Sequence, residues 1–284
     1  MNPSQPYPEQ PHSGRAASRR HNGFLFLVGL TLLAGYACKK VIQVDLKNAA
    51  SQIVIEGEVT NLSQTYQVRI TKTVDFSADN TYPPVSGATV QVTDSSTGHS
   101  MSYTESSPGV YTNNGFTGVP KHIYNLLVIA EGKEYRATSV MPLPVPLDSI
   151  TFARNTDFSN KQDINAVVNF QDPPGLGNYY QFTEYLNGKL IPDIFVFEDR
   201  LSDGRYIEQP LFNDSTYLRS GDTLQLKMYC VDKNIYDYFN TLIQVTGNNN
   251  FQSATPANPN TNISNGALGY FSAHTMTQEK LVVY

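Results

Sequence analysis

Histidine, the most versatile catalytic and metal-binding side chain, is sparse in this chain. Beyond residue 37 it occurs only at His99, His122 and His274. No two of these have the short spacing of a zinc site, and the His-Glu-x-x-His pattern of zinc proteases does not occur. The Gly-x-Ser-x-Gly turn that presents a nucleophilic serine is also missing. We therefore expect no catalytic residues, no metal and no cofactor, and a hydrolase is kept only as a third functional interpretation.

Carboxylates are the second reactive group. Glu198 and Asp199 are adjacent, and Asp232 lies further along the chain. Their oxygens suit calcium or the hydroxyl groups of a glycan, but the spacing of acidic residues in a calcium-binding loop is missing. Solvated strand ends explain these residues equally well.

Tyrosine is the remaining functional signal, because its rigid ring can stack on a ligand while its hydroxyl group stays polar. The chain has 18 tyrosines. Five of them are our candidate ligand-binding residues: Tyr179, Tyr180, Tyr206, Tyr217 and Tyr270. Packing in the core or at sheet edges is the competing interpretation. Those exposed together would form a stacking platform for a sugar or peptide, or a docking surface for a receptor.

The first 37 residues predict export. Arginines between positions 15 and 20 precede the apolar run 24–34, and Gly35-Tyr36-Ala37 lead into Cys38. This order is typical of a signal peptide. The apolar run is too short to cross a hydrocarbon core, which needs about 20 residues. We expect residues 1–37 to be removed and Cys38 to carry lipid, palmitate included, so that the chain is anchored to a membrane.

The predicted cleavage site departs from the usual lipoprotein pattern. Gly35 and Tyr36 stand where leucine and a small residue are expected, and only Ala37 matches. An ordinary secretory signal that is cut nearby, with Cys38 unmodified, stays an alternative. A twin-arginine signal is a further alternative because Arg19-Arg20 precedes the run, although the apolar pair expected directly behind it is replaced.

The charge of the mature chain argues against nucleic acid as a partner. Removing Arg15, Arg19, Arg20 and Glu9 from 20 basic and 25 acidic residues leaves 17 and 24, which is a net charge of −7. Without a basic stripe, a chain cannot neutralise a phosphate backbone.

Composition and turn residues predict an all-β protein with two β-sandwich domains. Residues 38–142 are expected to form the first, of the immunoglobulin-like or transthyretin-like kind. Alternating runs at 53–59 and 66–72 predict an antiparallel pair, and further short strands follow up to residues 134–140. Prolines at 142, 144 and 146 should keep their segment extended and outside a sheet centre, so we place the domain boundary there.

Residues 143–284 are predicted to form the second, β-rich domain with one amphipathic helix near 232–246. Apolar residues at three- and four-residue spacing behind a cap at Asp232 indicate that helix. Cys230 continues an apolar alternation and is expected in the core, without a disulfide. The polar stretch 248–262 is predicted to be a loop, either a solvated connector or a binding loop.

Several motifs occur in a fixed order along the chain. They are IVIEGEVT at 53–60, PPVSGATV at 83–90, SPGVY at 107–111, MPLPVPLDSI at 141–150 and NPNTNISNGALGYFSA at 258–273. The second and third motifs are similar to those of carboxypeptidase-regulatory-like modules. Such modules mostly bind other molecules or act as spacers between domains. The whole series resembles the Bacteroidota lipoproteins grouped as domain-of-unknown-function family 4249. That resemblance implies an envelope lipoprotein, often encoded beside a TonB-dependent outer-membrane receptor, with no established reaction.

Two functions follow as expectations. The first is a non-enzymatic accessory or ligand-binding component of a TonB-dependent nutrient uptake system, anchored to the outer membrane by its lipid, with the receptor as partner and an unspecified ligand. The alternative is an adhesin or fimbria-like structural surface lipoprotein. Lys39 and Lys40 follow the cysteine where some surface lipoproteins carry acids, so a periplasmic and a cell-surface location both stay open.

Overall fold

A computed structural model of the chain describes residues 51–75, 81–156, 162–213, 216–246 and 258–284. The predicted signal peptide, residues 1–37, and the predicted lipidation site Cys38 lie outside these residues. So does most of the predicted loop 248–262.

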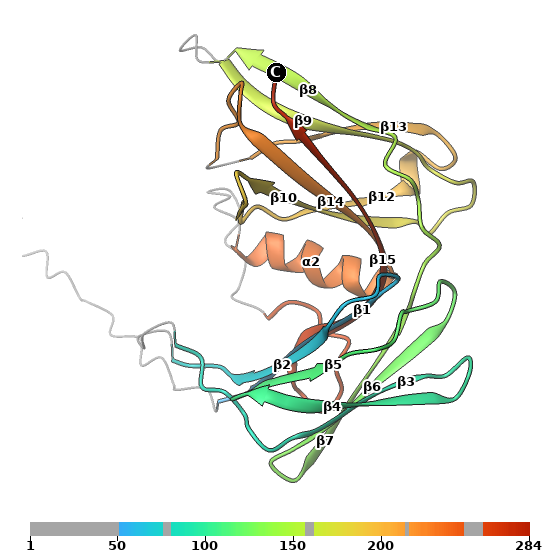
Figure 1. Cartoon of the computed structure of the whole chain (residues 1–284), viewed down its shortest axis with the longest axis vertical. Coiled ribbons are helices and arrows are strands. Elements are labelled where there is room, and N and C mark those ends of the chain that lie inside the picture. Colours follow the sequence, from blue (N-terminus) through green and yellow to red (C-terminus); the bar gives the residue numbers. More distant parts are fainter. Residues whose placement is uncertain (1–50, 76–80, 157–161, 214–215, 247–257) are drawn as a thin grey trace, which may run out of the picture. The chain divides into compact units, whose positions relative to one another are not determined.

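The described chain is built mainly from strands, with one α-helix and one short 3-10 helix (Figure 1). The first seven strands are β1 (Ile53–Thr60), β2 (Tyr66–Lys72), β3 (Thr89–Asp94), β4 (His99–Ser107), β5 (Val110–Asn113), β6 (Ile123–Ala130) and β7 (Lys133–Val140). The later elements are β8 (Ser149–Thr156), β9 (Gln162–Gln171), β10 (Tyr179–Leu186), β11 (Lys189–Leu190), β12 (Phe195–Glu198), η1 (Asp199–Leu201), β13 (Tyr206–Leu211), β14 (Thr223–Val231), α2 (Lys233–Thr246) and β15 (Leu268–Val282). The predicted all-β class with a single amphipathic helix is confirmed.

Two sheets contain these strands. The larger has the order β11-β10-β14-β15-β1-β2-β5-β4-β3-β6-β7, with β12 also paired to β10, and the smaller has the order β13-β9-β8. The larger sheet curls back on itself at one end. An isolated bridge between Ala137 and Ile263, and a hydrogen bond from the Ala273 amide to Ser139 Oγ, bring β7 against the segment around β15.

Two hydrophobic cores result from this arrangement. The first is enclosed by the curled part of the larger sheet and contains inward residues of β1 to β7, such as Ile55, Val68 and Leu126. The second lies between the smaller sheet and β10, β14 and the chain end, where Phe170 packs on Tyr180 with ring centroids 4.8 Å apart. Between Met141 of the first core and Val145 of the second, the chain crosses from one core to the other within the proline segment, and residues 263–273 later return to the first core.

The long strand β15 belongs to both halves (Figure 1). Its first part, from Leu268 to His274, runs parallel to β1, and its second part, from Thr275 to Val282, runs antiparallel to β14. Because side chains alternate along a strand, Phe271 points into the first core. The predicted second domain, residues 143–284, therefore contributes its last strand to the core of the first.

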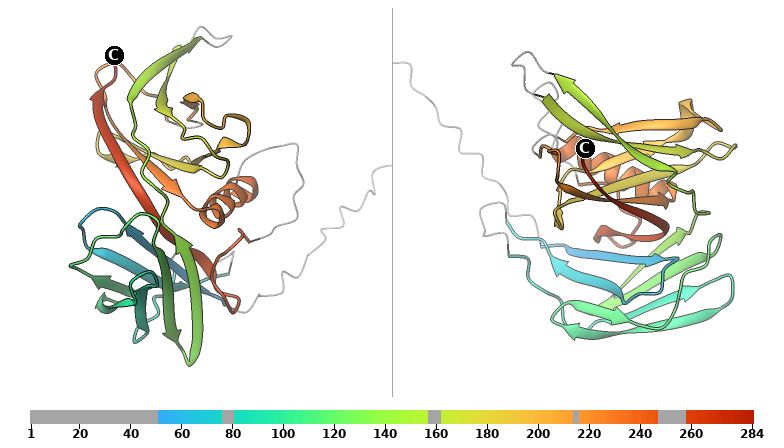
Figure 2. Two further views of the ribbon diagram at one scale, coloured as in Figure 1. Left: turned by 90° about the vertical axis from the view of Figure 1, so that its right-hand side faces the viewer. Right: turned by 45° about the horizontal axis from the view of Figure 1, so that its top comes forward.

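Helix α2 packs on the face of the larger sheet that points away from both cores, which we call the outer face (Figure 2). Asp232 caps the helix by accepting a hydrogen bond from the Ile235 amide, as its position in the sequence predicts. Ile235 is the buried apolar residue of the helix. Among the described residues, none of the helical segments combines the length and the apolar content required to span a membrane.

Candidate functional site

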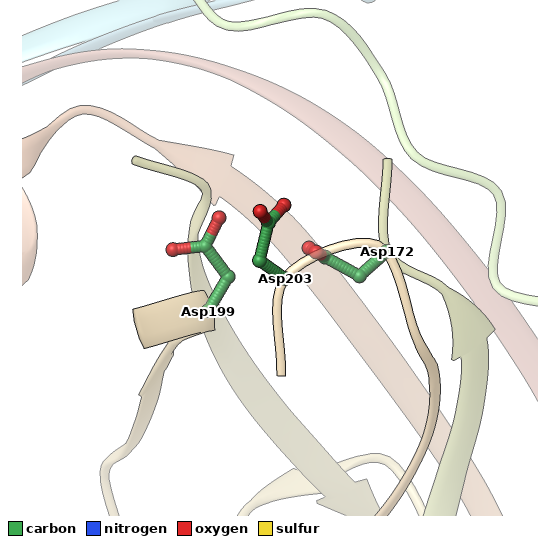
Figure 3. A group of neighbouring side chains, drawn as sticks. All are labelled: Asp172, Asp199 and Asp203. Carbon is green, nitrogen blue, oxygen red and sulfur yellow. The ribbon is translucent and has the colours of Figure 1, made fainter. Parts of the chain in front are cut away.

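Three aspartates converge at one end of the second core (Figure 3). Asp172 follows β9, Asp199 begins η1, and Asp203 lies in the turn after it. One carboxylate oxygen of each lies within 4.8 Å of the others. Asp172 and Asp199 are buried, whereas Asp203 is exposed.

Protein donors already occupy the Asp172 carboxylate. One oxygen accepts a hydrogen bond from the Tyr180 hydroxyl group, and the other accepts one from the Gly204 amide at 2.9 Å. Burial is the larger cause that raises the pKa of Tyr180 well above its ordinary value, and the hydrogen bond that its hydroxyl group donates to Asp172 raises it further. The pair therefore ties β10 to the turn at Gly204.

Asp199 and Asp203 hold the neighbouring loop in the same way. Asp199 accepts hydrogen bonds from the amides of Gly177 and Asn178, at 3.1 and 3.0 Å, and from the Asn178 side chain. Asp203 accepts one from the Gly175 amide at 2.6 Å. Carboxylate oxygens are ligands that calcium prefers, yet these bonds already explain why three acids gather here. The sequence singled out Asp199 but not Asp172 or Asp203, which stand beside Pro173 and Gly204, residues that are typical of turns.

His274, the third histidine considered in the sequence, forms a pair with Ser272. Ser272 Oγ and His274 Nδ1 lie 3.0 Å apart on β15, and both residues face away from the first core. This pairing activates serine in hydrolases when substrate can reach it. Here Ser272 is 3% exposed and His274 is 5% exposed, and the Tyr229 ring packs edge-on against the imidazole. No substrate can approach the hydroxyl group without displacing that packing.

Of the other two histidines, His122 is paired with an aspartate and His99 is exposed. His122 Nδ1 lies 2.8 Å from Asp94 Oδ2. Burial raises the pKa of Asp94, but the bonds from His122 and from the turn behind Asp94 more than offset it, so the pKa falls below its ordinary value. His99 is exposed at the start of β4.

A recess of about 270 Å³ opens on the outer face beside α2. It is lined by residues of three adjacent strands: Glu56, Gly57 and Glu58 of β1, Gln67 and Arg69 of β2, and Tyr270 of β15. We call these six residues the Tyr270 recess. The register explains the grouping, because Glu56 is paired with Arg69 on one side and with Tyr270 on the other.

Aromatic residues of α2 hold the ring of Tyr270. The Tyr238 and Phe239 rings have centroids 4.9 and 5.1 Å from it. Burial raises the pKa of the Tyr238 hydroxyl group to about 12 and that of Tyr270 above its ordinary value. The tyrosine therefore stays neutral, and its orientation is fixed by packing.

The five candidate tyrosines lie in different environments. Tyr180 is buried in the second core, whereas Tyr179 is on the outer face and stacks on a tyrosine of α2. Tyr206, on β13, is 52% exposed, and Tyr217 lies in the segment before β14 and is also exposed. Tyr270 alone among the five lines a cavity described above.

A second and larger cavity, of about 540 Å³, follows the proline segment. Residues 140–146 form one wall, and residues of the loop after β9 form the other. We call it the proline groove. Leu143 in this wall is 54% exposed, and Leu176, between the lining residues Pro174 and Asn178, is 70% exposed. Predominantly apolar cavities of this size are typical of binding sites.

Comparison with known proteins matches most of the chain to a family model. No curated protein matches the chain. A family model described as a domain of unknown function, DUF4249, matches residues 39–280, which include the first core, most of the second core, the Tyr270 recess and the proline groove. The chain therefore belongs to the DUF4249 family.

Proposed function

We propose that the protein is a non-enzymatic binding component of a nutrient uptake system, anchored by lipid to the outer membrane, which acts beside a TonB-dependent receptor. The Tyr270 recess carries this proposal, because it brings an oriented aromatic ring together with polar side chains on an accessible face. The candidate catalytic groups point the same way, since Ser272 and His274 are buried and the three aspartates are engaged by protein donors.

The anchor is the first part of the proposal to test. Cys38→Ser should release the protein from the membrane fraction, because one thiol would carry the acyl chains. Intact-mass measurement of the wild-type protein should show a start at residue 38 with fatty acyl groups attached. A retained start methionine, or a mature terminus without acyl groups, would contradict the anchor.

The receptor is expected to bind at the proline groove. Leu143 lines the groove, Leu176 lies in the loop that contributes Pro174 and Asn178 to it, and both side chains are exposed. Burying this apolar area against a partner is favourable. A tagged full chain is extracted from its own cells in mild detergent, and co-purifying proteins are identified by mass spectrometry. We expect a TonB-dependent receptor.

Substitution locates that contact. Leu143→Asp with Leu176→Asp should reduce receptor recovery at least about tenfold, because two charges would be buried in the interface. Leu190→Asp, at an exposed leucine of β11, is the matched control and should leave recovery unchanged. A clean monomer after crosslinking in whole cells would contradict the partnership.

The adhesin alternative has less support. Fibres of this class need a terminal strand that can be exchanged between copies. Here β15 pairs with β1 along its first part and with β14 along its second, and β1 pairs with β15 and β2. Exchange of β1 or β15 between copies would break the strand's hydrogen bonds to both of its neighbours. We therefore keep the proposal that the protein is a binding component.

A further inference from the structure

The polar side chains that line the Tyr270 recess make no hydrogen bond or ion pair with the described part of the chain. Among the described residues, Glu56, Glu58, Gln67 and Arg69 make no hydrogen bond or ion pair with their side chains, even though Glu56 and Arg69 are directly opposed on neighbouring strands. Donors and acceptors that converge on one cavity without partners are available to a ligand.

We propose that the Tyr270 recess binds one neutral sugar ring, an inference that rests on the proposed binding function. Hydroxyl groups both donate and accept hydrogen bonds. They can therefore donate to the carboxylates of Glu56 and Glu58 and accept from Arg69 and Gln67 at the same time. The apolar face of a pyranose ring would pack on Tyr270.

The mixed charge of the recess favours an uncharged ligand over an ion. Two carboxylates and one guanidinium line it, and Lys227 lies close enough to Glu58 to lower the pKa of that carboxyl group in part, against the larger effect of burial, which raises it. An anion would meet the carboxylates, and a cation would meet Arg69. Charge pairs that water can reach contribute little to affinity, so shape and hydrogen bonding dominate.

The size of the recess and its fixed ring limit the ligand further. Its volume of about 270 Å³ is just below the roughly 300–1,000 Å³ of drug-sized pockets, which suits a single ring. Packing by Tyr238 and Phe239 orients Tyr270 before any ligand arrives. Less side-chain freedom is then lost on binding.

The test uses the full chain purified in detergent and a panel of glucose, galactose, mannose, xylose and N-acetylglucosamine. Saturation-transfer difference NMR measures which of these sugars binds. We expect at least one to bind with a dissociation constant on the order of 1 mM, as few contacting atoms allow. Tyr270→Leu keeps apolar bulk under α2 but removes the stacking ring, and it should weaken binding at least about tenfold.

Two further variants keep the proposal falsifiable if Tyr270→Leu does not fold. Arg69→Ala and Glu58→Gln change side chains that line the recess without packing in either core, and each should weaken binding several-fold. Tyr206→Leu replaces an exposed tyrosine on β13 and is the matched control, with binding unchanged.

Three outcomes would overturn the inference. One is no saturation transfer to any sugar in the panel, and another is transfer that the recess variants leave intact. The third is loss of the sugar signal when free glutamate or arginine is added at equal concentration, which would assign the recess to charged ligands. Receptor recovery that persists while sugar binding fails would leave the proposed function in place, so the two failures are distinguishable.

Discussion

Two buried ionisable side chains respond to pH in opposite directions. Burial, together with the positive charge of Lys227, lowers the pKa of His274 from 6.5 to about 4. The folded protein therefore keeps this imidazole neutral in a pH range where an unfolded chain would protonate it. Between about pH 4 and 6.5 the unfolded chain binds more protons at this position, so His274 makes the free energy of unfolding rise with pH.

Glu184 has the opposite effect. It points from β10 into the second core, where burial raises its pKa from 4.5 to about 7, although the Asn213 amide donates a hydrogen bond to it at 2.9 Å. Between about pH 4.5 and 7 the folded protein binds more protons at this position. Glu184 therefore makes the free energy of unfolding fall as pH rises.

We predict that these two contributions nearly cancel in the wild-type protein between pH 4.5 and 6.5. In Glu184→Gln only His274 still titrates, so the free energy of unfolding should rise by about 3 kcal/mol across the His274 titration. In His274→Gln only Glu184 still titrates, so the free energy of unfolding should fall by about 3 kcal/mol across the Glu184 titration. Urea unfolding at several pH values measures this, with exposed His99→Gln as the control. Parallel pH profiles for all four proteins would show that neither group titrates as its burial requires.

At the scale of elements, glycine decides whether β15 can lie against β1. Gly269 has φ 92°, and a Cβ atom added there would lie 2.1 Å from the Ile55 carbonyl oxygen. Gly266 also has a positive φ of 75°, but an added Cβ atom would meet nothing within 4 Å. Of these two glycines, only Gly269 lies against the backbone of β1.

Gly269→Ala should therefore destabilise the protein by about 3 kcal/mol or more, because backbone strain adds to a clash that β1 cannot relieve. Gly266→Ala is the matched control. It introduces backbone strain without a clash and should lower the free energy of unfolding by about 1 kcal/mol. Chemical denaturation measures both. Equal costs for the two variants would mean that β15 does not approach β1 this closely.

Asp232 joins two elements through one carboxylate. One of its oxygens caps α2 at Ile235, and the other accepts hydrogen bonds from Ser139 Oγ at 2.6 Å and from the Val140 amide at 3.0 Å. The cap was predicted from the sequence. The contact with β7 was not, because β7 is remote along the chain.

We expect Asp232→Ala to lower the free energy of unfolding by about 2 kcal/mol, since it removes a helix cap and leaves a hydroxyl and an amide group without their acceptor. Asp237→Ala, which removes only the ion pair with Lys233 on the exposed side of α2, should cost less than about 0.5 kcal/mol. Thermal and urea unfolding compare the two variants.

At the scale of the whole molecule, β15 couples the two cores because it hydrogen bonds to strands of both. Leu126 lies in the first core, and Cys230 lies in the second and is buried. If the cores unfold together, damage to one must expose the other. Cooperative unfolding of this kind is a measurable property.

Leu126→Ala should cost about 3 kcal/mol by leaving a cavity in the first core. We predict that the Cys230 thiol then becomes reactive at a lower urea concentration. This concentration should fall by the same amount as the urea midpoint of unfolding measured by circular dichroism. Leu201→Ala, at an exposed leucine, is the control. Unchanged thiol protection in Leu126→Ala would show that the cores unfold independently.

Local patterns were sufficient for the individual elements. Apolar alternation predicted strands at 53–59 and 66–72, close to the observed β1 and β2, and the spacing behind Asp232 predicted the helix seen at Lys233–Thr246. These features depend on residues a few positions apart, whose contacts the periodicity of a strand or helix fixes. The family resemblance, now supported by the match over residues 39–280, also came from short motifs in order.

Contacts between distant segments required the folded chain. The parallel pairing of β15 with β1, the convergence of Asp172 with Asp199, and the recess around Tyr270 each join residues that are separated by other strands. Tyr179 and Tyr180 show the limit most clearly, because neighbours in sequence point to opposite faces of β10 and only one is buried. Strand alternation says that their faces differ, but which face meets a core depends on how remote strands pack.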